Sequence, residues 1–436
     1  MSDIAFQERD IININKKNRF NKFFLFTRKG FRKLFFKEKV TVKKICIYPV
    51  INNIDDLSDL LNRISFSLPS SNIKIFISVS KELINIDISK LKIPEDQRNY
   101  LSENKLNFIF VSKSKIFKYF FTSQAILLWK IKYIYNPLLL LNYFKIEIID
   151  KNYYSTEESK YWMRTYYSTL KKNEKQYHEE LSKKNYLELL NKYKGYKKAY
   201  CFVTGPSFDK YKEFKFEKDS LKYACNSVVK NMDFFKYING PEILAFSDPV
   251  FHFSPCKYAA KFRDNVIEVF NKYNCYIVVP DIIVPLLLNY YPEIKDKIIG
   301  LGISKEMNFP NPDNLTIKIS GNVLTQYMLP IASFISDEIY ILGADGRKKD
   351  EKYFWKHSSS VQYDDLMNTV FKTHPSFFRD RVYTDYYDKH CNFLNDLIEY
   401  GEKRGKKYFS LTPSYIDFLN KRYTGGKNDI KRKIKK

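Results

Sequence analysis

Residues able to contact a small anionic ligand recur in the second half of the chain, each time directly after an apolar, strand-like run. The run Ala199–Val203 ends in Thr204-Gly205-Pro206-Ser207. Four later runs end in Asn226-Ser227, Ser247-Asp248, Ser320-Gly321-Asn322 and Gly343-Ala344-Asp345-Gly346-Arg347. Because the carboxyl ends of parallel strands meet at one edge of a sheet, we expect these residues to outline a single crevice.

The side chains at these strand ends have the chemistry that a nucleotide requires. Asn and Asp can bond to a base edge or to ribose hydroxyls, whereas glycine and serine at the start of a helix suit a phosphate. The expected nucleotide contacts are Thr204, Gly205, Pro206, Ser207, Asn226, Asp248, Ser320, Gly321, Asn322 and Asp345. The planar fork of Arg347 suits the phosphate of a leaving group, Tyr353 is expected beside it, and His357 borders the same crevice.

The elements that must position these residues follow from the hydrophobic pattern. Short β-branched and aromatic runs alternate with longer helical patterns, which is typical of parallel α/β architecture. The expected strands are Lys44–Val50, Ile73–Val79, Phe108–Val111, Ile146–Ile149, Ala199–Val203, Lys222–Cys225, Ile243–Phe246, Tyr276–Val279, Leu315–Ile319, Glu338–Leu342 and Tyr408–Leu411.

A chain of 436 residues is long enough for two cores, so we predict an α/β protein with two Rossmann-like domains and mostly parallel sheets. The expected organisation is a basic aromatic segment at 1–40, an N-terminal Rossmann-like domain at 41–154, a helical connector at 155–197, a C-terminal Rossmann-like domain at 198–420 and a basic tail at 421–436.

The order of the strand-end motifs resembles the bacterial sialyltransferases of glycosyltransferase family 42, which use CMP-N-acetylneuraminic acid, and a wider group of flagellin-modification proteins with a related core. The family's motifs run G-N-G-P-S, C-N, N-P, T-S-G, G-I-D and C-P-N-S. The equivalents here are T-G-P-S at 204–207, C-N at 225–226, D-P at 248–249, I-S-G at 319–321, G-A-D at 343–345 and L-T-P-S at 411–414. The resemblance covers residues 198–418 and implies that this half binds a CMP-activated sugar.

Three departures from the family pattern bear on the donor. Thr204 replaces the asparagine of the first motif, Asp248 replaces that of N-P, and Arg347 stands where the family's tyrosine contacts the donor phosphate. Asp248 would favour ribose hydroxyls and repel a nearby phosphate, whereas the fork of Arg347 matches phosphate oxygens. The resemblance therefore implies an acidic sugar, with sialic acid, Kdo and related sugars all open.

The resemblance also implies a catalytic base in the loop ahead of the last long helix, where it removes the proton of the attacking acceptor hydroxyl. His374 lies in that loop, Asp385 lies closer to the family's spacing, and His390 stands at the start of the helical pattern that follows. Each has a structural alternative, as a turn residue, an N-cap and a helix-face residue respectively. All three stay candidate catalytic residues.

The charge of the chain favours an anionic partner. Lys and Arg outnumber Asp and Glu by 74 to 49, which gives a formal net charge of +25. The excess is densest at 16–39, where Lys and Arg are interleaved with Phe, and at 421–436, although a Lys-rich composition of the whole chain contributes as well. Such segments bind anionic membrane surfaces, and no run offers the roughly 20 apolar residues that span a bilayer. We expect a cytoplasmic protein peripherally associated with the inner membrane.

Neither a disulfide framework nor a cofactor is expected. The six cysteines form no CxxC pair, and no D-x-D motif stands at a strand end. A donor with a single phosphate can be stabilised by Arg, Tyr or a helix N-terminus in place of a metal ion.

These expectations combine into a metal-independent, inverting glycosyltransferase that moves an acidic sugar from a CMP donor to a bacterial surface glycan or lipid-linked acceptor. One alternative is a nucleotide-dependent pyrophosphokinase or another transferase on the same core, which would want acidic metal ligands and Mg²⁺. The other is a non-enzymatic nucleic-acid-binding protein, which would explain the charge and leave the polar strand ends without a role.

Overall fold

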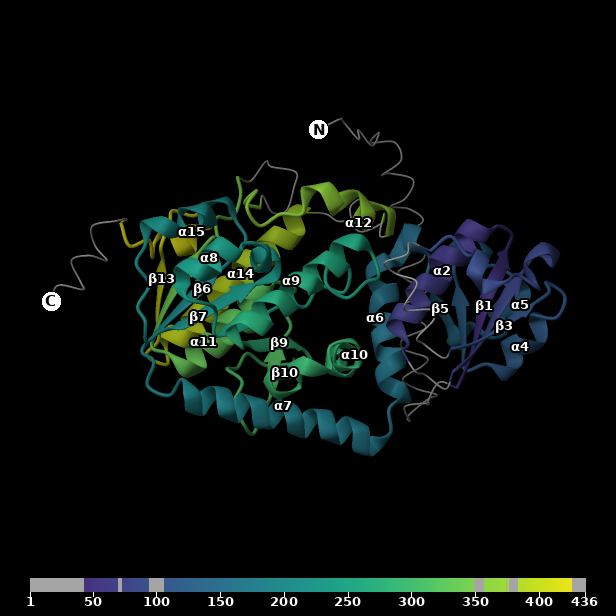
Figure 1. Cartoon of the computed structure of the whole chain (residues 1–436), viewed down its shortest axis with the longest axis horizontal. Coiled ribbons are helices and arrows are strands. Elements are labelled where there is room, and N and C mark those ends of the chain that lie inside the picture. Colours follow the sequence, from purple (N-terminus) through teal and green to yellow (C-terminus); the bar gives the residue numbers. More distant parts are fainter. Residues whose placement is uncertain are drawn as a thin grey trace. The chain divides into compact units, whose positions relative to one another are not determined.

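The computed structural model describes residues 43–69, 73–93, 106–348, 357–373, 375 and 383–425, with the backbone alone at 88, 152–160 and 383–385. The chain divides into two compact units (Figure 1). The first extends to Thr169 and also takes in the described residues Thr373 and Pro375, and the second comprises the other described residues from Leu170 onward. This division falls inside the stretch 155–197 that we expected to connect the domains. The basic segment 1–40 and the tail from 426 onward lie outside the described residues.

Unit 1 is a parallel sheet with the order β3-β2-β1-β4-β5. Its strands are β1 (Lys44–Ile51), β2 (Lys74–Val79), β3 (Asn107–Val111), β4 (Ala125–Leu128) and β5 (Ile146–Ile148), and its helices are α2 (Ile54–Ser67), α4 (Phe117–Thr122), α5 (Pro137–Leu140) and α6 (Lys151–Thr169). Strand β1 reads KICIYPVI and is buried along almost its whole length. A strand covered on both faces needs apolar residues at successive positions, which explains this continuous run.

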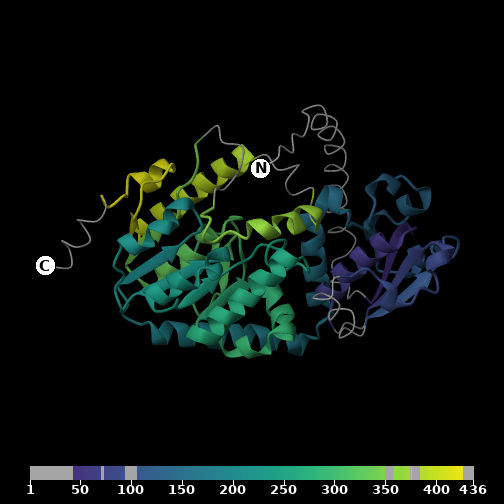
Figure 2. The ribbon, with the colours of Figure 1, turned by 45° about the horizontal axis from the view of Figure 1, so that its top comes forward.

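Unit 2 is a larger parallel sheet with the order β11-β10-β9-β8-β7-β6-β12-β13. Its strands are β6 (Lys198–Phe202), β7 (Leu221–Cys225), β8 (Ile243–Ala245), β9 (Tyr276–Pro280), β10 (Ile298–Ser304), β11 (Thr316–Lys318), β12 (Glu338–Leu342) and β13 (Lys407–Ser410). Its helices are α7 (Lys172–Lys192), α8 (Met232–Ile238), α9 (Lys257–Tyr273), α10 (Val284–Tyr290), α11 (Leu329–Ile335), α12 (Met367–Thr373), α14 (Tyr383–Glu402) and α15 (Asp417–Asn420). Helices flank this sheet on both faces (Figure 1 and Figure 2).

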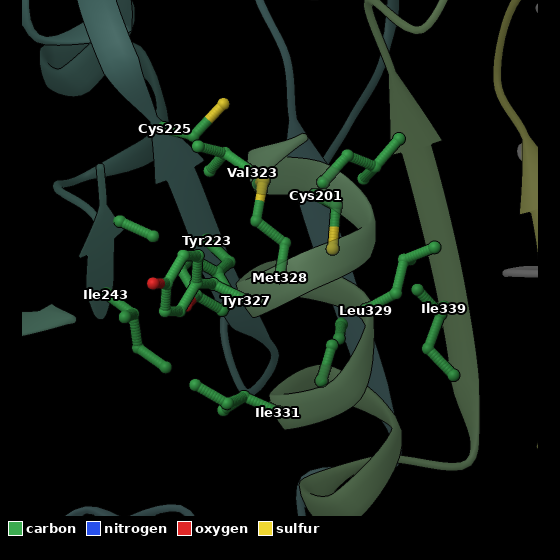
Figure 3. Close-up of a cluster of buried hydrophobic side chains, with 14 of the residues drawn as sticks. Cys201, Tyr223, Cys225, Ile243, Val323, Tyr327, Met328, Leu329, Ile331 and Ile339 are labelled. Atoms are coloured by element: carbon green, nitrogen blue, oxygen red, sulfur yellow. The ribbon is translucent and has the colours of Figure 1, made fainter. Parts of the chain in front are cut away.

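The strand alternation of unit 2 sends side chains into two separate apolar layers. Cys201, Tyr223 and Ile339 point to the layer that contains α11 and the π-helix before it, η9 (Leu324–Met328) (Figure 3). Phe202 points to the opposite layer, where its ring meets Phe234 of α8 at 4.8 Å between centroids. Apolar layers therefore cover both faces of the sheet, so the ends of its strands are where polar residues can be placed.

The two-domain parallel α/β architecture expected from the sequence is what the structure shows. Two strands were missed: β4, which lies inside a longer apolar stretch, and β10, whose two glycines weaken the strand pattern. No helix in the described part of the chain is long and apolar enough to cross a bilayer. All six cysteines are free, and all but Cys391 are buried.

Strands β6 and β12 of unit 2 approach each other closely where they end. Gly205 N donates to Gly343 O at 2.9 Å, one step beyond the last rung of the β6/β12 ladder. A Cβ on Gly343, whose φ is +88°, would lie 2.1 Å from Val203 O, and a Cβ on Gly205 would lie 2.3 Å from Gly343 O. Both positions therefore require glycine, one of them for its left-handed backbone as well.

We predict that Gly343→Ala lowers the free energy of unfolding of unit 2 by at least about 3 kcal/mol, because the methyl group meets a backbone oxygen that cannot move away cheaply. Gly405→Ala is the matched control, since Gly405 has a φ of +81° and no atom within 4 Å of an added Cβ. The control should lose only about 1–2 kcal/mol, the cost of the backbone conformation. Chemical denaturation followed by circular dichroism measures both, and equal losses would contradict the close-approach argument.

Candidate functional site

A pocket lies beyond the carboxyl ends of β6, β7 and β12. Along the chain the strands run outward from β6 to β11, and β12 then returns to the other side of β6, so the order reverses at this point. The pocket is open to solvent and has a cavity volume of about 50 Å³. Its walls are Val203, Thr204, Gly205, Cys225, Asn226, Asn322, Val323, Leu324, Gly343, Ala344, Asp345, Gly346, His357, His390 and Ile416.

Asp345 joins three segments that are far apart in the sequence. Its Oδ2 accepts a hydrogen bond from Ser207 N at 3.0 Å, and its backbone oxygen accepts one from Tyr415 N at 2.7 Å. The hydroxyls of Ser207 and Thr412 are 2.9 Å apart, so the segments 204–207, 343–345 and 411–414 are bonded to one another. Burial raises the pKa of the Asp345 carboxyl, and the bonds from Ser207 oppose that rise.

His357 contributes an imidazole to the pocket wall. Its Nδ1 lies 2.8 Å from Thr204 Oγ1, and the backbone amide of the next residue, Ser358, donates to Thr204 O at 2.8 Å. The hydroxyl of Ser358 donates to Asp209 Oδ1 at 2.6 Å, which fixes the segment against the 3-10 helix η5 (Pro206–Glu213). Burial lowers the pKa of His357 to about 4.

His390 contributes a second imidazole, from α14. Its side chain is 2% exposed, and burial lowers its pKa to about 4. Tyr387, one turn earlier on the same helix, lies against the loop after β12, where a Cβ on Gly346 would come 2.7 Å from its hydroxyl. Gly346 has a φ of +69°, so the tight approach of α14 to this loop depends on that glycine. Both imidazoles are neutral at pH 7.

Two asparagines shape the pocket on the side of β7 and η9. Asn226 adopts the left-handed conformation with a φ of 48°, and its buried Oδ1 has no hydrogen-bond partner among the described residues. Asn322 Oδ1 accepts from Leu324 N at 2.9 Å, and Gln326 N donates to Asn322 O at 2.8 Å. Asn322 thus starts η9, whose wide turns are a feature of functional sites in other proteins.

The side chain of Arg347 is a buried cation next to the pocket wall. It directly follows the pocket residue Gly346, is 3% exposed, and stacks on Tyr387 with its Cζ 5.0 Å from the ring centroid. In the part of the chain that the structure describes, Nε and Nη2 of its guanidinium have no hydrogen-bond partner. A buried guanidinium with two unbonded nitrogens is costly, and a bound anion would offset that cost.

Other expected nucleotide contacts lie beside the pocket and not in its walls. Asp248 Oδ1 accepts from the amides of Val250 and Phe251 at 2.7 and 3.0 Å, so this carboxylate caps its own turn after β8. Ser320 Oγ lies 2.8 Å from Thr325 Oγ1. Pro206, Ser207 and Gly321 also lie outside the pocket wall. The amide of Ser207 nevertheless donates a hydrogen bond to the carboxylate of Asp345, which is part of that wall.

The expected catalytic residues fare differently. His390 lies in the pocket wall, whereas Asp385 lies in α14 as judged from the backbone, and its side chain is not described. His374 and Tyr353 lie outside the described residues. Sequence reasoning named His357 as a neighbour of the crevice without selecting it as a site residue, and it missed the apolar wall of Val203, Val323 and Ile416, for which only the strand-end position is a signal.

Among the described residues, no three His, Cys, Asp or Glu side chains gather in a way that could hold a metal ion. Comparisons of this chain with protein-family models, with curated proteins and with solved structures found no match.

The neutral histidines give the folded protein a defined acid sensitivity. Unfolded histidine binds a proton near pH 6.5, whereas His357 and His390 do so only near pH 4 in the folded state. Between these values the unfolded state binds more protons, so the free energy of unfolding falls as the pH falls from about 6.5 to about 4. We predict a shallower fall for His390→Gln, measured by denaturant titration at several pH values. The titration of Asp345 changes the free energy of unfolding in the opposite direction, but equally in the parent and the variant, so its effect cancels in the comparison. Parallel stability curves for the two proteins would contradict the burial of a neutral His390.

Proposed function

We propose that unit 2 is the donor-binding domain of a glycosyltransferase that moves an acidic sugar from a CMP-activated donor to a glycan acceptor. The observation that carries the proposal is the pocket at the reversal of strand order between β6 and β12, with a buried, unpartnered Arg347 directly after its wall. Open parallel sheets bind nucleotides at this position. The order of the strand-end motifs, which resembles that of family 42 sialyltransferases, supports a CMP-sugar over other nucleotides.

The groups around the pocket suit the parts of such a donor. The partnerless Oδ1 of Asn226 accepts a hydrogen bond, as a cytosine amino group or a ribose hydroxyl would require. The free donors of Arg347 match two phosphate oxygens, which supports charge stabilisation by the protein when CMP departs. No metal ion is needed in this scheme, because the leaving group carries one phosphate.

The reaction is an inverting displacement. The acceptor oxygen forms a bond to the anomeric carbon of the sugar while the bond from that carbon to the CMP phosphate oxygen breaks, and the electron pair leaves with CMP. A base takes the proton of the acceptor hydroxyl. His390 and His357 both border the pocket with a neutral imidazole, which supports either of them in this role. His374 and Asp385 stay candidates through the family resemblance.

We also propose a peripheral location at the cytoplasmic face of the inner membrane, where a lipid-linked or surface-glycan acceptor is assembled. The net charge of +25 and the basic segments at both ends support it.

The first test is thermal stabilisation of the full chain by CMP, CDP, UDP, GDP and ATP, each with and without Mg²⁺. A ligand that binds only the folded state stabilises it by about 2.7 kcal/mol at 100 times its Kd. We expect stabilisation by CMP and CDP that is indifferent to Mg²⁺, followed by release of CMP from CMP-sialic acid or CMP-Kdo. Stabilisation by ATP with Mg²⁺ alone would favour a pyrophosphokinase, and no stabilisation by any nucleotide would overturn the proposal.

Arg347→Met separates a ligand-binding role of Arg347 from a structural one. Methionine keeps the packing against Tyr387 and removes the unpartnered charge, so the variant without ligand should be unchanged or more stable by about 1 kcal/mol. The stabilisation by CMP should fall by at least half, and Arg347→Lys, which keeps the charge but loses the fork, should be intermediate. A variant that is less stable than the parent and still binds CMP fully would contradict the assignment.

A further inference from the structure

The exposed apolar side chains of unit 1 come from one stretch of the chain. Among the described residues of this unit, the large apolar side chains classed as exposed are Phe121, Tyr133, Tyr135, Leu140 and Leu141. All five fall between 121 and 141, in and around α4, α5 and the 3-10 helix η3 (Ile131–Tyr133). The side chain of Leu141 is 68% exposed and that of Tyr135 is 63% exposed, so this stretch of the chain leaves large apolar groups in contact with water. We call it the α4–α5 surface.

Hydrogen bonds and ring contacts join these segments into one surface. Helices α4 and α5 pack against each other, and Lys145 Nζ, from the loop after α5, donates to Phe120 O at 3.1 Å and to Phe121 O at 2.9 Å at the end of α4. The ring of Tyr133 lies 6.0 Å from that of Tyr48, which also contacts Phe117 of α4 at 6.2 Å. Figure 1 shows α4 and α5 on the same side of the sheet of unit 1.

Buried residues of the core alternate with the exposed side chains along this stretch. Phe120 and Leu139 are completely buried in the core of the unit, next to the exposed Phe121 and Leu140. Ile134 is 2% exposed between the exposed tyrosines 133 and 135. The apolar groups are therefore displayed by a fixed backbone, which lowers the entropy lost when they bind a partner.

The same stretch of sequence is purely basic. Residues 106–146 contain six lysines and no aspartate or glutamate. The side chains of Lys113, Lys115, Lys118 and Lys132 are exposed, and among the described residues none of the four forms an ion pair. A further lysine of the stretch, Lys130, lies 3.7 Å from Asp56. Apolar side chains among exposed lysines without ion pairs fit an anionic bilayer, where the apolar groups enter the headgroup boundary and the ammonium groups meet lipid phosphates and carboxylates.

We propose that the α4–α5 surface is a membrane-docking surface that binds anionic lipid bilayers. A second copy of the chain suits it less well, because two such surfaces would bring like charges together. The inference deepens the peripheral location proposed above by assigning it to a folded surface of unit 1, separate from the basic ends. It makes no use of the nucleotide pocket.

The test is co-sedimentation of the full chain with vesicles of phosphatidylcholine containing about 30% phosphatidylserine, and with vesicles of phosphatidylcholine alone, in the absence of nucleotide. We expect the parent protein to bind the anionic vesicles only. The Leu140→Ser/Leu141→Ser variant should bind these vesicles about tenfold more weakly, or weaker still. The matched control is Leu187→Ser/Ile303→Ser in unit 2, where the two side chains are 38% and 69% exposed against 49% and 68% in the test pair. The control should bind like the parent.

A charge variant tests the second half of the proposal. Lys118→Glu/Lys132→Glu should lose binding to anionic vesicles, whereas Lys261→Glu/Lys403→Glu, which makes the same change in net charge at exposed positions of unit 2, should lose much less. Equal loss for both pairs would mean that overall charge and not this surface drives binding, and would overturn the proposal.

Two further results would overturn it. One is full binding by the Leu140→Ser/Leu141→Ser variant, and the other is a concentration-dependent dimer, seen by sedimentation velocity without vesicles, that this variant abolishes. The second result would assign the surface to a copy of the chain. Neither affects the nucleotide stabilisation experiment, so failure here and failure of the proposed transferase are distinguishable.

Discussion

The close approach of β6 and β12 at their carboxyl ends is the constraint on which the rest of unit 2 depends. Gly205 and Gly343 let two backbones meet where side chains would collide, and the bond between them extends the ladder one step beyond the strands. The segments that follow both strands line the pocket. Its position therefore follows from two missing Cβ atoms as much as from the polar groups in its wall.

The polar wall is stabilised by bonds between segments that the sequence keeps far apart. Ser207, Asp345 and Thr412 come from loops after three different strands and form one hydrogen-bonded cluster. His357 and His390 are neutral because burial disfavours their charged form. Arg347 stays charged, because a guanidinium does not lose its proton in proteins. The pocket wall therefore holds two neutral imidazoles, and the buried guanidinium of Arg347 directly follows it in the chain.

The fold class and much of the pocket could be predicted from the sequence, and the failures have identifiable physical reasons. Apolar runs of five residues mark a doubly covered strand, so β6, β7, β9 and β12 were found, but glycines within β10 and the long apolar context of β4 hid those strands. Thr204, Asn226, Asn322 and Asp345 were correctly placed at strand ends that converge. The local bonds of Asp248 could not be predicted, because an aspartate after a strand caps its own turn as readily as it faces a ligand, and spacing alone does not distinguish the two.

The burial of the native thiols has a practical consequence. Five of the six cysteines are enclosed, and burial raises the pKa of Cys46, Cys201, Cys225 and Cys275, so little reactive thiolate is available at the surface of the folded protein. A cysteine introduced at an exposed position would therefore react far faster than the native ones. One such residue on each unit would accept a pair of spin labels or dyes once Cys391, the one half-buried cysteine, has been replaced, which opens the chain to distance spectroscopy as a ligand is added.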